Sequence, residues 1–421
     1  MIKVGIIGVG TVGTSVANIL RENSDIISAR AGVEIVPVIG VVKNLEKKRD
    51  VTIELTNDPS RVVDNPEIDI VVELMGGVEE AYELVKRALE NGKSVVTANK
   101  ALLAYHRYDL QKIAGDLPLF YEASVAGGIP IIGALRNGLS ANHIESIIGI
   151  LNGTCNYMLT KMIQEGVSYD AVLKEAQELG YAEADPTFDV GGFDAAHKLL
   201  ILASIAYGID AKPEDILIEG IEKISQTDVD FAKEFGYEIK LLGIAKKGNG
   251  GVEIRVHPAL IRATHPIAKV DGVMNAISVV GDRVGETMFY GPGAGGDATA
   301  SSVIADIIEI ARGNRGPMLG YKKGLESGFR LLDRSEIVSK YYLKLKVIDQ
   351  PGVLAAVTSV LANKGISISS VLQKDSRIEN RVRLLLTTHS CKESQIEEAI
   401  ESLKELESVG DGNISMLRIV E

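Results

Sequence analysis

The stretch Gly8-Val9-Gly10-Thr11-Val12-Gly13 decides the fold of the first part of the chain. It follows a short apolar run at residues 4–7 and opens an apolar-periodic stretch at 12–20. Between a strand and a helix, the first glycine makes a tight turn, the second lets a pyrophosphate approach, and the third lets the helix pack on the strand. The helix N-terminus also attracts phosphate. We therefore predict a dinucleotide site with contacts from Gly8, Gly10, Thr11, Val12 and Gly13; the alternative is a glycine-rich turn without a ligand.

Strands and helices alternate around this loop. Residues 35–42, 68–74 and 94–97 are typical of strands, and 78–90 is typical of a helix that ends at Asn91-Gly92. Such alternation predicts βαβ units and a parallel sheet. We assign residues 1–130 to an α/β, Rossmann-type dinucleotide-binding domain, and we expect a second glycine-rich segment, at about 291–318, to return to it.

The rest of the chain divides into two further parts. Residues 131–320 mix expected strands (144–150, 252–257) with expected helices (158–179, 193–207), which predicts an α+β domain. Residues 341–421 follow the ferredoxin-like order βαββαβ, and the glycine- and charge-rich segment 321–340 is typical of a linker. The expected elements of this last part are strands at 341–348, 366–373, 381–388 and 415–420, and helices ending near 363 and spanning 394–407.

The composition excludes several classes of protein. Of the 421 residues, 46% are hydrophobic and 24% are charged, which is the balance of a globular rather than a disordered chain. The net charge of −12 argues against nucleic-acid binding, which normally needs a basic face. No apolar run reaches the roughly 18 residues of a membrane span. The two cysteines, Cys155 and Cys391, provide no disulfide framework and no metal cluster, so we expect a reducing, cytoplasmic setting.

The end of the second expected strand carries bases where an NAD-selective site carries an acid. In sites for NAD, an Asp or Glu at this point binds the ribose 2′-hydroxyl. Here the strand is followed by Lys43 and then by Lys47, Lys48 and Arg49, which could hold the 2′-phosphate of NADP. We predict that NADP is preferred or at least accepted. The alternative is a solvated basic turn, because charge runs are usually just solvated.

The densest chemistry lies at residues 180–198, where Glu183, Asp185, Asp189 and Asp194 have no basic residue among them. The helix that follows is apolar almost all round, so it must be buried. Asp194 and Lys198 are four residues apart and share one face of it. A buried Asp–Lys pair beside a loop of acids indicates a pocket for a cationic, amino-bearing substrate. The alternative is a structural ion pair in which Asp194 also caps the helix.

Four other segments each leave two interpretations open. Lys100 follows the fourth strand, at the sheet edge where ligands gather, but its position also fits a plain surface lysine. Residues 122–129 either offer a carboxylate and backbone carbonyls to a hard cation or form a loop between domains. Cys155 is either a nucleophile or a buried small residue. The glycine loop at 291–300 either returns to the cofactor or is a flexible turn.

With these residues assembled, the chain resembles the homoserine dehydrogenase family along essentially its whole length. The resemblance implies an NAD(P)-dependent oxidoreductase that reversibly reduces L-aspartate 4-semialdehyde to L-homoserine, on the route to threonine and methionine. It also implies that residues 131–320 form the catalytic and dimerisation domain. The motifs that carry it, in the family's order, are the GVGTVG loop, ANK at 98–100, EASVAGGIP at 122–130, NGTCNY at 152–157, GYAEADPTFDVGGFDAAHK at 180–198 and GPGAGGDATAS at 291–301.

The resemblance also implies roles for individual side chains around the substrate. Lys198 would be the general acid that protonates the carbonyl oxygen as hydride arrives. Lys100 would assist in the same pocket and would also touch the cofactor. Glu183 and Asp194 would hold the amino acid through its ammonium group, with Asp189 in support.

The same resemblance implies contacts to a cofactor and to a metal ion. Further cofactor contacts would come from Gly180, Gly295 and Lys43. A sodium ion would be bound by Glu122 and the backbone carbonyls of Val125, Gly127 and Ile129. Two positions depart from the family's pattern: Lys43 stands where many members have arginine, and Asp297 replaces a common proline.

The C-terminal part resembles an ACT domain, with Asp349-Gln350-Pro351-Gly352 as its first strand-to-helix turn. Gly352 would let a small amino acid approach backbone N–H groups, so we predict feedback inhibition by threonine or another amino acid of the pathway. The alternative is an oligomerisation module without a ligand. A homodimer is the default for such folds, and pairing of ACT domains is a route to a homotetramer. Two rival functions stay open: another NAD(P)-linked amino-acid or semialdehyde dehydrogenase, which would use Cys155, and a non-catalytic amino-acid sensor.

Overall fold

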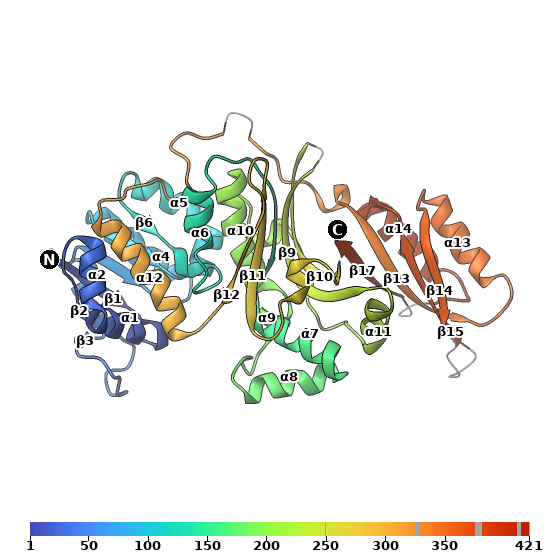
Figure 1. Ribbon diagram of the computed structural model, residues 1–421, viewed down its shortest axis with the longest axis horizontal. Coiled ribbons are helices and arrows are strands. Elements are labelled where there is room, and N and C mark those ends of the chain that lie inside the picture. The colour runs from blue at the N-terminus through green and yellow to red at the C-terminus, as the bar shows by residue number, and fades with distance from the viewer. Residues whose placement is uncertain (249, 326–327, 375–380, 411–413, 421) are drawn as a thin grey trace.

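The structure is a computed structural model that describes residues 1–421 apart from 249, 326–327, 375–380, 411–413 and 421. Its three parts follow one another along the long axis, from the N-terminal sheet through a central sheet to a C-terminal α/β unit (Figure 1). Within the described ranges, no helix is both long and apolar enough to cross a membrane.

The N-terminal part is a parallel six-stranded sheet in the order β3-β2-β1-β4-β5-β6. This is the doubly wound order, so the predicted parallel sheet is confirmed. Ligands of such sheets bind at the carboxyl ends of the strands, where the strand order reverses. The strands are β1 (Ile2–Ile7), β2 (Ile35–Val41), β3 (Glu54–Thr56), β4 (Ile70–Glu73), β5 (Ser94–Thr97) and β6 (Leu119–Phe120), and the helices are α1 (Thr11–Glu22), α2 (Ser24–Ala31), α3 (Ser60–Val63), α4 (Glu79–Glu90) and α5 (Lys100–Ala114).

A helix from much later in the chain completes this part. The helix α12 (Gly296–Ala311) lies beside α1 in Figure 1. Its buried residues Val303 and Ile307 share one apolar core with Val16 and Leu20 of α1. Burial of these aliphatic side chains therefore brings the second glycine loop, which precedes α12, next to the first one.

The central part surrounds one buried helix. The helix α10 (Phe193–Tyr207) matches the range expected from its sequence, and most of its residues are buried. Around it lie η1 (Glu122–Ser124), α6 (Ile131–Gly133), η2 (Ala134–Gly138), β7 (Ile144–Ile150), α7 (Gly153–Glu165), α8 (Tyr169–Glu178), α9 (Thr187–Val190), η3 (Pro213–Asp215), β8 (Leu217–Ile218), α11 (Gln226–Glu234), β9 (Tyr237–Gly248), β10 (Gly251–Arg262), η4 (Pro266–Lys269), β11 (Met274–Gly281) and β12 (Gly285–Pro292).

The prediction of one helix over residues 158–179 is wrong. The chain forms the two helices α7 and α8 there. Gly166 ends α7 with a left-handed φ of 69°, and Ser168 begins α8 as its N-cap residue. Glycine and serine in these places are the usual stop and start signals, so the break could have been found in the sequence.

The C-terminal part has the predicted ferredoxin-like order. Its strands lie in the order β17-β13-β15-β14, and the two helices lie on one side of the sheet (Figure 1). Its last strand also pairs in parallel with β10, so the central and C-terminal sheets are continuous. The elements are η5 (Arg334–Glu336), β13 (Val338–Ile348), α13 (Val353–Asn363), β14 (Ile368–Lys374), β15 (Arg381–Thr388), β16 (Cys391–Lys392), α14 (Glu393–Lys404) and β17 (Ile414–Val420).

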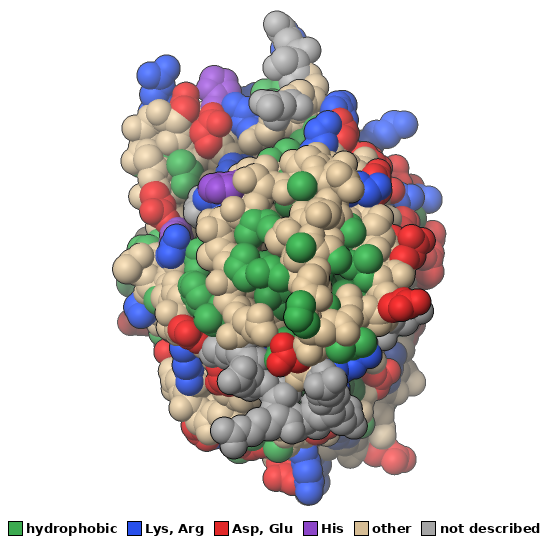
Figure 2. Space-filling view, turned by 90° about the vertical axis from the view of Figure 1, so that its right-hand side faces the viewer, with side chains coloured by type: hydrophobic (Ala, Val, Ile, Leu, Met, Phe, Trp, Pro, Cys, Tyr) green, Lys and Arg blue, Asp and Glu red, His purple; other side chains and the backbone are tan. Residues whose placement is uncertain are grey.

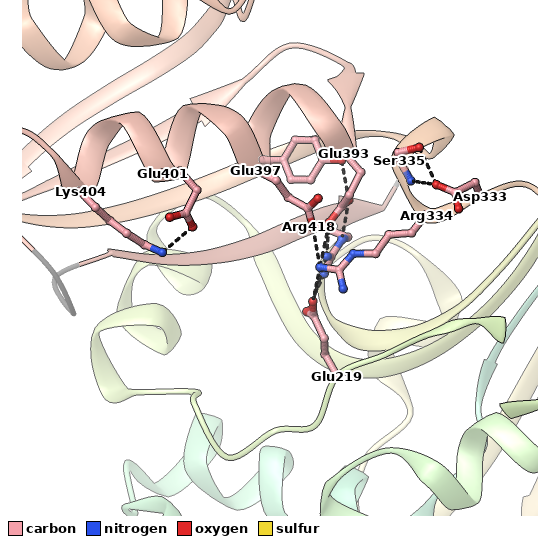
Figure 3. Close-up of polar contacts among 10 residues, drawn as sticks. Glu219, Asp333, Arg334, Ser335, Glu393, Glu397, Glu401, Lys404 and Arg418 are labelled. Atoms are coloured by element: carbon pink, nitrogen blue, oxygen red, sulfur yellow. Dashed lines mark hydrogen bonds and ion pairs between the residues drawn. The ribbon is translucent and has the colours of Figure 1, made fainter. Parts of the chain in front are cut away.

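A buried arginine also joins the central and C-terminal parts through hydrogen bonds. The guanidinium of Arg418 on β17 donates to both carboxylate oxygens of Glu219, at 2.7 and 3.0 Å, and to Glu393 at the start of α14 (Figure 3). Glu219 follows β8 in the central part. Although burial acts to raise the pKa of Glu219, its bonds to Arg418 lower that pKa below the ordinary value. Arg334 adds an outer ion pair to Glu397, at 2.6 Å.

Candidate active site

Asp194 is the centre of a polar cluster at the start of α10. Its Oδ2 atom accepts hydrogen bonds from Lys198 Nζ at 2.7 Å and from Asn152 Nδ2 at 2.9 Å. Its Oδ1 atom lies 3.0 Å from Lys100 Nζ. Lys100 begins α5 of the N-terminal part, and Asn152 caps α7, so the cluster joins side chains from the first two parts of the molecule. The sequence predicted the pairing of Asp194 with Lys198 but not the bond to Asn152.

The pKa values of the two lysines are shifted in opposite directions. Burial lowers the pKa of Lys198, and the nearby charge of Lys100 adds to this, against the attraction of Asp194. Burial also acts to lower the pKa of Lys100, but the charges of Asp194, Asp189 and Glu183 outweigh it and raise that pKa. Lys198 is therefore the lysine that releases its proton more easily. Such a group suits proton transfer near neutral pH better than an ordinary lysine does.

A cavity of about 720 Å³ opens over this cluster, between the N-terminal and central parts. It is lined by Lys100, Asp194 and Lys198 together with Glu183 and Asp189. Glu183 is exposed, whereas Asp189 is half-buried and accepts a hydrogen bond from Asn152 at 2.8 Å. Burial and the charge of Asp194 raise the pKa of Asp189. Predicted cofactor residues line the same cavity, namely Val12 and Gly180.

A second cavity, of about 310 Å³, lies at the first glycine loop and is lined by Gly8, Gly10 and Lys43. A Cβ atom on Gly8 would lie 2.6 Å from the backbone of Leu74, and one on Gly13 would lie 2.4 Å from the carbonyl oxygen of Gly8. These two glycines are needed for packing. By contrast, no other described atom lies within 4 Å of the Cβ position of Gly10, so that side of the loop is open. An open glycine flanked by a helix N-terminus fits a pyrophosphate.

The second glycine loop lies against the first. A Cβ atom on Gly296 would come within 3.2 Å of Thr11 Cγ2. Gly295, just before it, has a left-handed φ of 122° and begins α12. The segment that contains Gly295 therefore lies beside Thr11, and the contact of both residues with one cofactor stays a prediction.

Arg49 is a residue of this site that the sequence analysis placed only in a general basic cluster. Its Nε atom donates to the carbonyl of Val9 in the glycine loop at 2.8 Å, and its Nη1 atom donates to the carbonyls of Asn44 and Lys47. Arg49 therefore holds the basic turn against the glycine loop, while the side chain of Lys43 is exposed at the cavity.

The residues expected to bind sodium form a tightly bonded loop. The carboxylate of Glu122 accepts backbone N–H bonds from Ile132 at 2.8 Å and from Gly133 at 2.6 Å. Ala126 has a φ of 54° and is the one non-glycine residue with positive φ in the described part of the chain. A strained backbone of this kind is retained where the surroundings require it. The donor set of one carboxylate and three carbonyls fits a hard cation.

The environment of Cys155 favours packing over catalysis. The side chain is fully buried, and its Sγ atom lies 3.2 Å from the carbonyl oxygen of Asp189, as a donor. Burial and the charge of Asp189 raise the pKa of the thiol well above its ordinary value. Since the thiolate is the nucleophilic form, this cysteine is a poor nucleophile.

The doubly wound sheet, the open glycine loop and the lysine–carboxylate cavity together define an NAD(P)-dependent oxidoreductase. Comparison with known families gives the finer class. Residues 8–116 match the NAD-binding domain of homoserine dehydrogenase, residues 130–308 match the homoserine dehydrogenase domain, and residues 341–408 match the ACT domain. The chain belongs to the homoserine dehydrogenase family.

Individual relatives support the same assignment. A homoserine dehydrogenase of Helicobacter pylori is 53% identical over 410 residues, which cover 97% of each chain. The crystal structure of a homoserine dehydrogenase from Thiobacillus denitrificans has a TM-score of 0.95 at 45% identity and covers 100% of this chain and 98% of its own. A hyperthermophilic archaeal homoserine dehydrogenase in complex with NADPH has a TM-score of 0.63 at 31% identity, over 73% of this chain and 97% of its own.

Proposed function

We propose that the chain reversibly reduces L-aspartate 4-semialdehyde to L-homoserine, with Lys198 as the general acid. The observation that carries this proposal is the buried ion pair between Lys198 and Asp194, which lines a cavity shared with the cofactor residues. A buried lysine of lowered pKa, held by one carboxylate, can both give a proton to an alkoxide oxygen and take it back.

A nicotinamide cofactor, when bound, would supply a hydride to the aldehyde carbon. As the carbonyl π bond breaks, negative charge develops on the oxygen, and the ammonium groups of Lys198 and Lys100 stabilise it. Lys198 then transfers a proton from Nζ to that oxygen, which completes the alcohol. Asp194 keeps both lysines in place, and Asn152 in turn holds Asp194. In the oxidation of homoserine the same proton returns to Nζ.

The amino-acid end of the substrate needs an acceptor for its ammonium group. We propose that Glu183 and Asp194 supply it, with Asp189 in support. Two lysines and one amide already bond to Asp194, so the exposed Glu183 is the carboxylate with the larger share of this contact. The acids of the cavity thus complement the cationic ammonium group of the substrate.

An assay with purified protein tests this function. L-homoserine and NADP are expected to give NADPH, followed by its absorbance, and aspartate semialdehyde with NADPH is expected to give the reverse reaction. Cys155→Ala is expected to keep both, because the thiol has no role in the proposed chemistry. A protein without activity toward homoserine, or one that loses all activity in Cys155→Ala, would favour the rival dehydrogenases or an amino-acid sensor.

The cofactor preference follows from the basic turn. We propose that NADP is the preferred cofactor, with Lys43 as the contact to its 2′-phosphate. Lys43→Asp is expected to lower the ratio of kcat/KM for NADP over NAD by about 10- to 100-fold, since a hydrogen bond to a charged group contributes about 1.5–3 kcal/mol. Lys48→Asp, an equal charge change at an exposed lysine of the same turn, is the control. Equal ratios in the two variants would contradict the assignment.

We also propose that Glu122 and the carbonyls of Val125, Gly127 and Ile129 hold a sodium ion. Burial raises the pKa of Glu122 against the two N–H bonds that oppose it, so a bound cation would favour its charged form. Sodium chloride is expected to raise the melting temperature above the value in tetramethylammonium chloride of equal ionic strength, because a ligand of the native state stabilises it. Glu122→Gln is expected to abolish this difference. A parent protein with equal melting temperatures in both salts would refute the site.

For the C-terminal part, we propose feedback inhibition by threonine at Gly352, and pairing with a second copy of the chain. Gly352 has a left-handed φ of 91°, begins α13 and is exposed. Nearby, Leu354 on α13 and Val371 on β14 are 43% and 44% exposed. In Figure 2 apolar side chains gather at the centre of this face, with charged side chains mostly around the rim. Such a patch beside the end strand of a sheet suits a second copy.

The contacts at the sheet junction connect this part to the active site. Arg418 bonds to Glu219, two residues before Ile221, whose N–H donates to the carbonyl of Val190 at 2.9 Å. Val190 is adjacent to Asp189 in the substrate cavity. A movement of the C-terminal part would therefore be transmitted to Asp189 in the cavity through the short segment from Glu219 to Ile221.

Two substitutions separate pairing from effector binding. Val371→Lys is expected to lower the oligomeric mass in light scattering and to weaken inhibition by L-threonine, because a charge enters the apolar face. Gly352→Ala is expected to weaken inhibition alone. Gly365→Ala, at another exposed glycine of the same part with a positive φ of 70°, controls for backbone strain. Unchanged threonine inhibition in both Val371→Lys and Gly352→Ala would contradict the regulatory role.

A further inference from the structure

Glu73 is a buried carboxylate without a cationic partner. It is the last residue of β4, at the carboxyl edge of the parallel sheet, and it is 0% exposed. It forms no ion pair with any residue that the structure describes. Burial of a carboxylate is costly unless hydrogen bonds compensate for the lost water. The bonds of Glu73 therefore indicate why a carboxylate stands at this point.

The side chain of Glu73 bonds to two turns of the chain at once. Its Oε1 atom accepts the backbone N–H of Met75 at 2.8 Å, and its Oε2 atom accepts the hydroxyl of Thr97 at 2.5 Å. Thr97 is the last residue of β5 and the register partner of Glu73 in the sheet. This one side chain therefore joins the turn that follows β4 to the turn that follows β5.

The contacts of Asn99 close these bonds into a ring. The hydroxyl oxygen of Thr97 accepts the backbone N–H of Asn99 at 3.0 Å. The Nδ2 atom of Asn99 donates to the carbonyl of Gly77 at 2.7 Å, so the ring returns to the turn that contains Met75. The Oδ1 atom of Asn99 accepts the N–H of Leu102 at 3.0 Å and so caps α5.

The ring borders the candidate active site. Gly77 and Asn99 line the cavity of about 720 Å³, and so does Lys100, the first residue of α5. Because Lys100 directly follows the capping residue, the conformation of Asn99 sets the point from which the lysine side chain starts. The Nζ atom of Lys100 lies 3.0 Å from Asp194 Oδ1. A misplacement of about 1 Å in such a group can lower a rate about 10²-fold.

We propose that Glu73 and Thr97 are positioning residues, which fix the first turn of α5 and so place the ammonium group of Lys100 beside Asp194. Both residues are 0% exposed, so they act through Asn99 and not by contact with the substrate. An apolar pair would leave the N–H groups of Met75 and Asn99 without these acceptors. The proposal rests on the proposed role of Lys100 in the reaction.

Two substitutions at Thr97 separate the hydroxyl from the packing. Thr97→Val keeps the shape of the side chain and loses the hydroxyl, whereas Thr97→Ser keeps the hydroxyl and loses the methyl group. In the oxidation of homoserine by the full-length protein, kcat is expected to fall about 3- to 10-fold in Thr97→Val, the range of one hydrogen bond. Thr97→Ser should keep kcat near the parent value and melt at a lower temperature, because it leaves a cavity. Equal losses of kcat in the two variants would overturn the proposal.

Glu73→Met tests the carboxylate itself. An unbranched apolar side chain opens the ring at both bonds, so kcat is expected to fall at least as far as in Thr97→Val. Turnover at the rate of the parent would overturn the proposal. If this variant does not fold, the two Thr97 variants decide.

Thr56→Val is the matched control. Thr56 ends β3 of the same sheet, and its hydroxyl accepts the backbone N–H of Asp58, two residues later, at 3.1 Å. Thr97 accepts from Asn99 in the same way, but the strands β2, β1 and β4 separate β3 from β5. Thr56→Val is expected to keep kcat near the parent value. A loss equal to that of Thr97→Val would mean that any such threonine affects turnover through folding, and would overturn the proposal.

A double-mutant cycle with Lys100 identifies the route of the effect. Lys100→Met is expected to lower kcat, and Thr97→Val is expected to have little further effect in that background, because the group that it misplaces is gone. If the two losses multiply instead, Thr97 acts independently of Lys100, and the positioning role is refuted while the role of Lys100 stands. Lys100→Met with the kcat of the parent would refute the role of Lys100 in the reaction and, with it, this proposal.

Discussion

Lys198→Ala is expected to lower kcat in both directions by about 10²- to 10⁴-fold, the usual contribution of a general acid or base. Binding of NADPH, measured by fluorescence, is expected to change little, because the loss concerns the transition state. Lys100 remains in the variant and still stabilises negative charge on the oxygen, which is why the activity is reduced and not abolished. A variant with near-parent turnover would show that Lys198 is only a structural partner of Asp194.

The pH dependence gives a second test of the same residue. In the proposed mechanism, reduction needs Lys198 protonated, and oxidation needs it neutral. Because burial lowers the pKa of Lys198 from its ordinary value, oxidation of homoserine should rise, and reduction of the aldehyde should fall, at a lower pH than an ordinary lysine would allow. In Lys198→Ala, both the rise of oxidation and the fall of reduction with pH are expected to disappear.

Lys240→Met is the matched control for Lys198→Ala. Lys240 is likewise a buried lysine, and its Nζ atom donates to the carbonyl of Val270 at 2.6 Å and to Asp271 at 3.1 Å. Its substitution should lower the melting temperature and leave kcat near the parent value. A similar loss of kcat in both variants would mean that any buried lysine disturbs the site through folding.

Arg418→Ala is expected to lower the free energy of unfolding by about 3–5 kcal/mol, the cost of breaking a buried ion pair from one side. Glu393 is fully buried, and Glu219 is partly buried, so both carboxylates would lose the nearer of the two arginines that they share. Urea unfolding measures this effect. The proposed inhibition by threonine should also weaken, since Glu219 would lose its two hydrogen bonds to β17 of the C-terminal part.

Protonation should relieve the defect in Arg418→Ala. In the parent, the lowered pKa of Glu219 means that its ion pair stabilises the fold at neutral pH and loses this effect as the pH falls through that pKa. In the variant, Glu219 loses the bonds that lower its pKa while its burial still acts to raise that pKa, so the difference from the parent should shrink toward acidic pH. A constant difference would indicate lost packing and not uncompensated charge.

Arg334→Ala is the control in the same cluster. Its side chain is 48% exposed, and its Nη2 atom pairs most closely with Glu397, at 2.6 Å, and more distantly with Glu219 and Glu393, at 3.6 and 3.9 Å. Exposed pairs contribute at most about 1 kcal/mol. If Arg334→Ala destabilised the protein as much as Arg418→Ala, burial would not be the reason for the larger effect.

Much of this fold could be predicted because its signals are local. The glycine loop, the run of strand and helix patterns, and the apolar helix over residues 193–207 are each determined by neighbours in the chain. The order βαββαβ likewise follows from the succession of short patterns. Gly166 and Ser168 are such signals too, and the prediction of one helix over residues 158–179 overlooked them.

The rest depends on contacts between distant segments. Asn152 and Asp194 meet because α7 and α10 begin side by side, and nothing in either segment specifies this meeting. Arg49 binds the glycine loop through backbone carbonyls, which every residue has. The pairing of β17 with β10 is visible only when the sheets are assembled. Charge and residue type indicated which side chains could carry the chemistry. The hydrogen bonds that orient these side chains come from segments far apart in the sequence.

The parallel pairing of β17 with β10 has a consequence for the order of folding. Ala259, Leu260 and Ile261 of the central sheet pair with Arg418, Ile419 and Val420. During synthesis, β10 emerges long before β17, and its edge at residues 259–261 stays uncovered until β17 has been made, whereas residues 255–256 pair with the earlier strand β8. Contacts between such distant segments form slowly, because a long loop must close first. The nascent chain therefore carries an open strand edge beside its catalytic core, and we expect it to be most prone to aggregation in that interval.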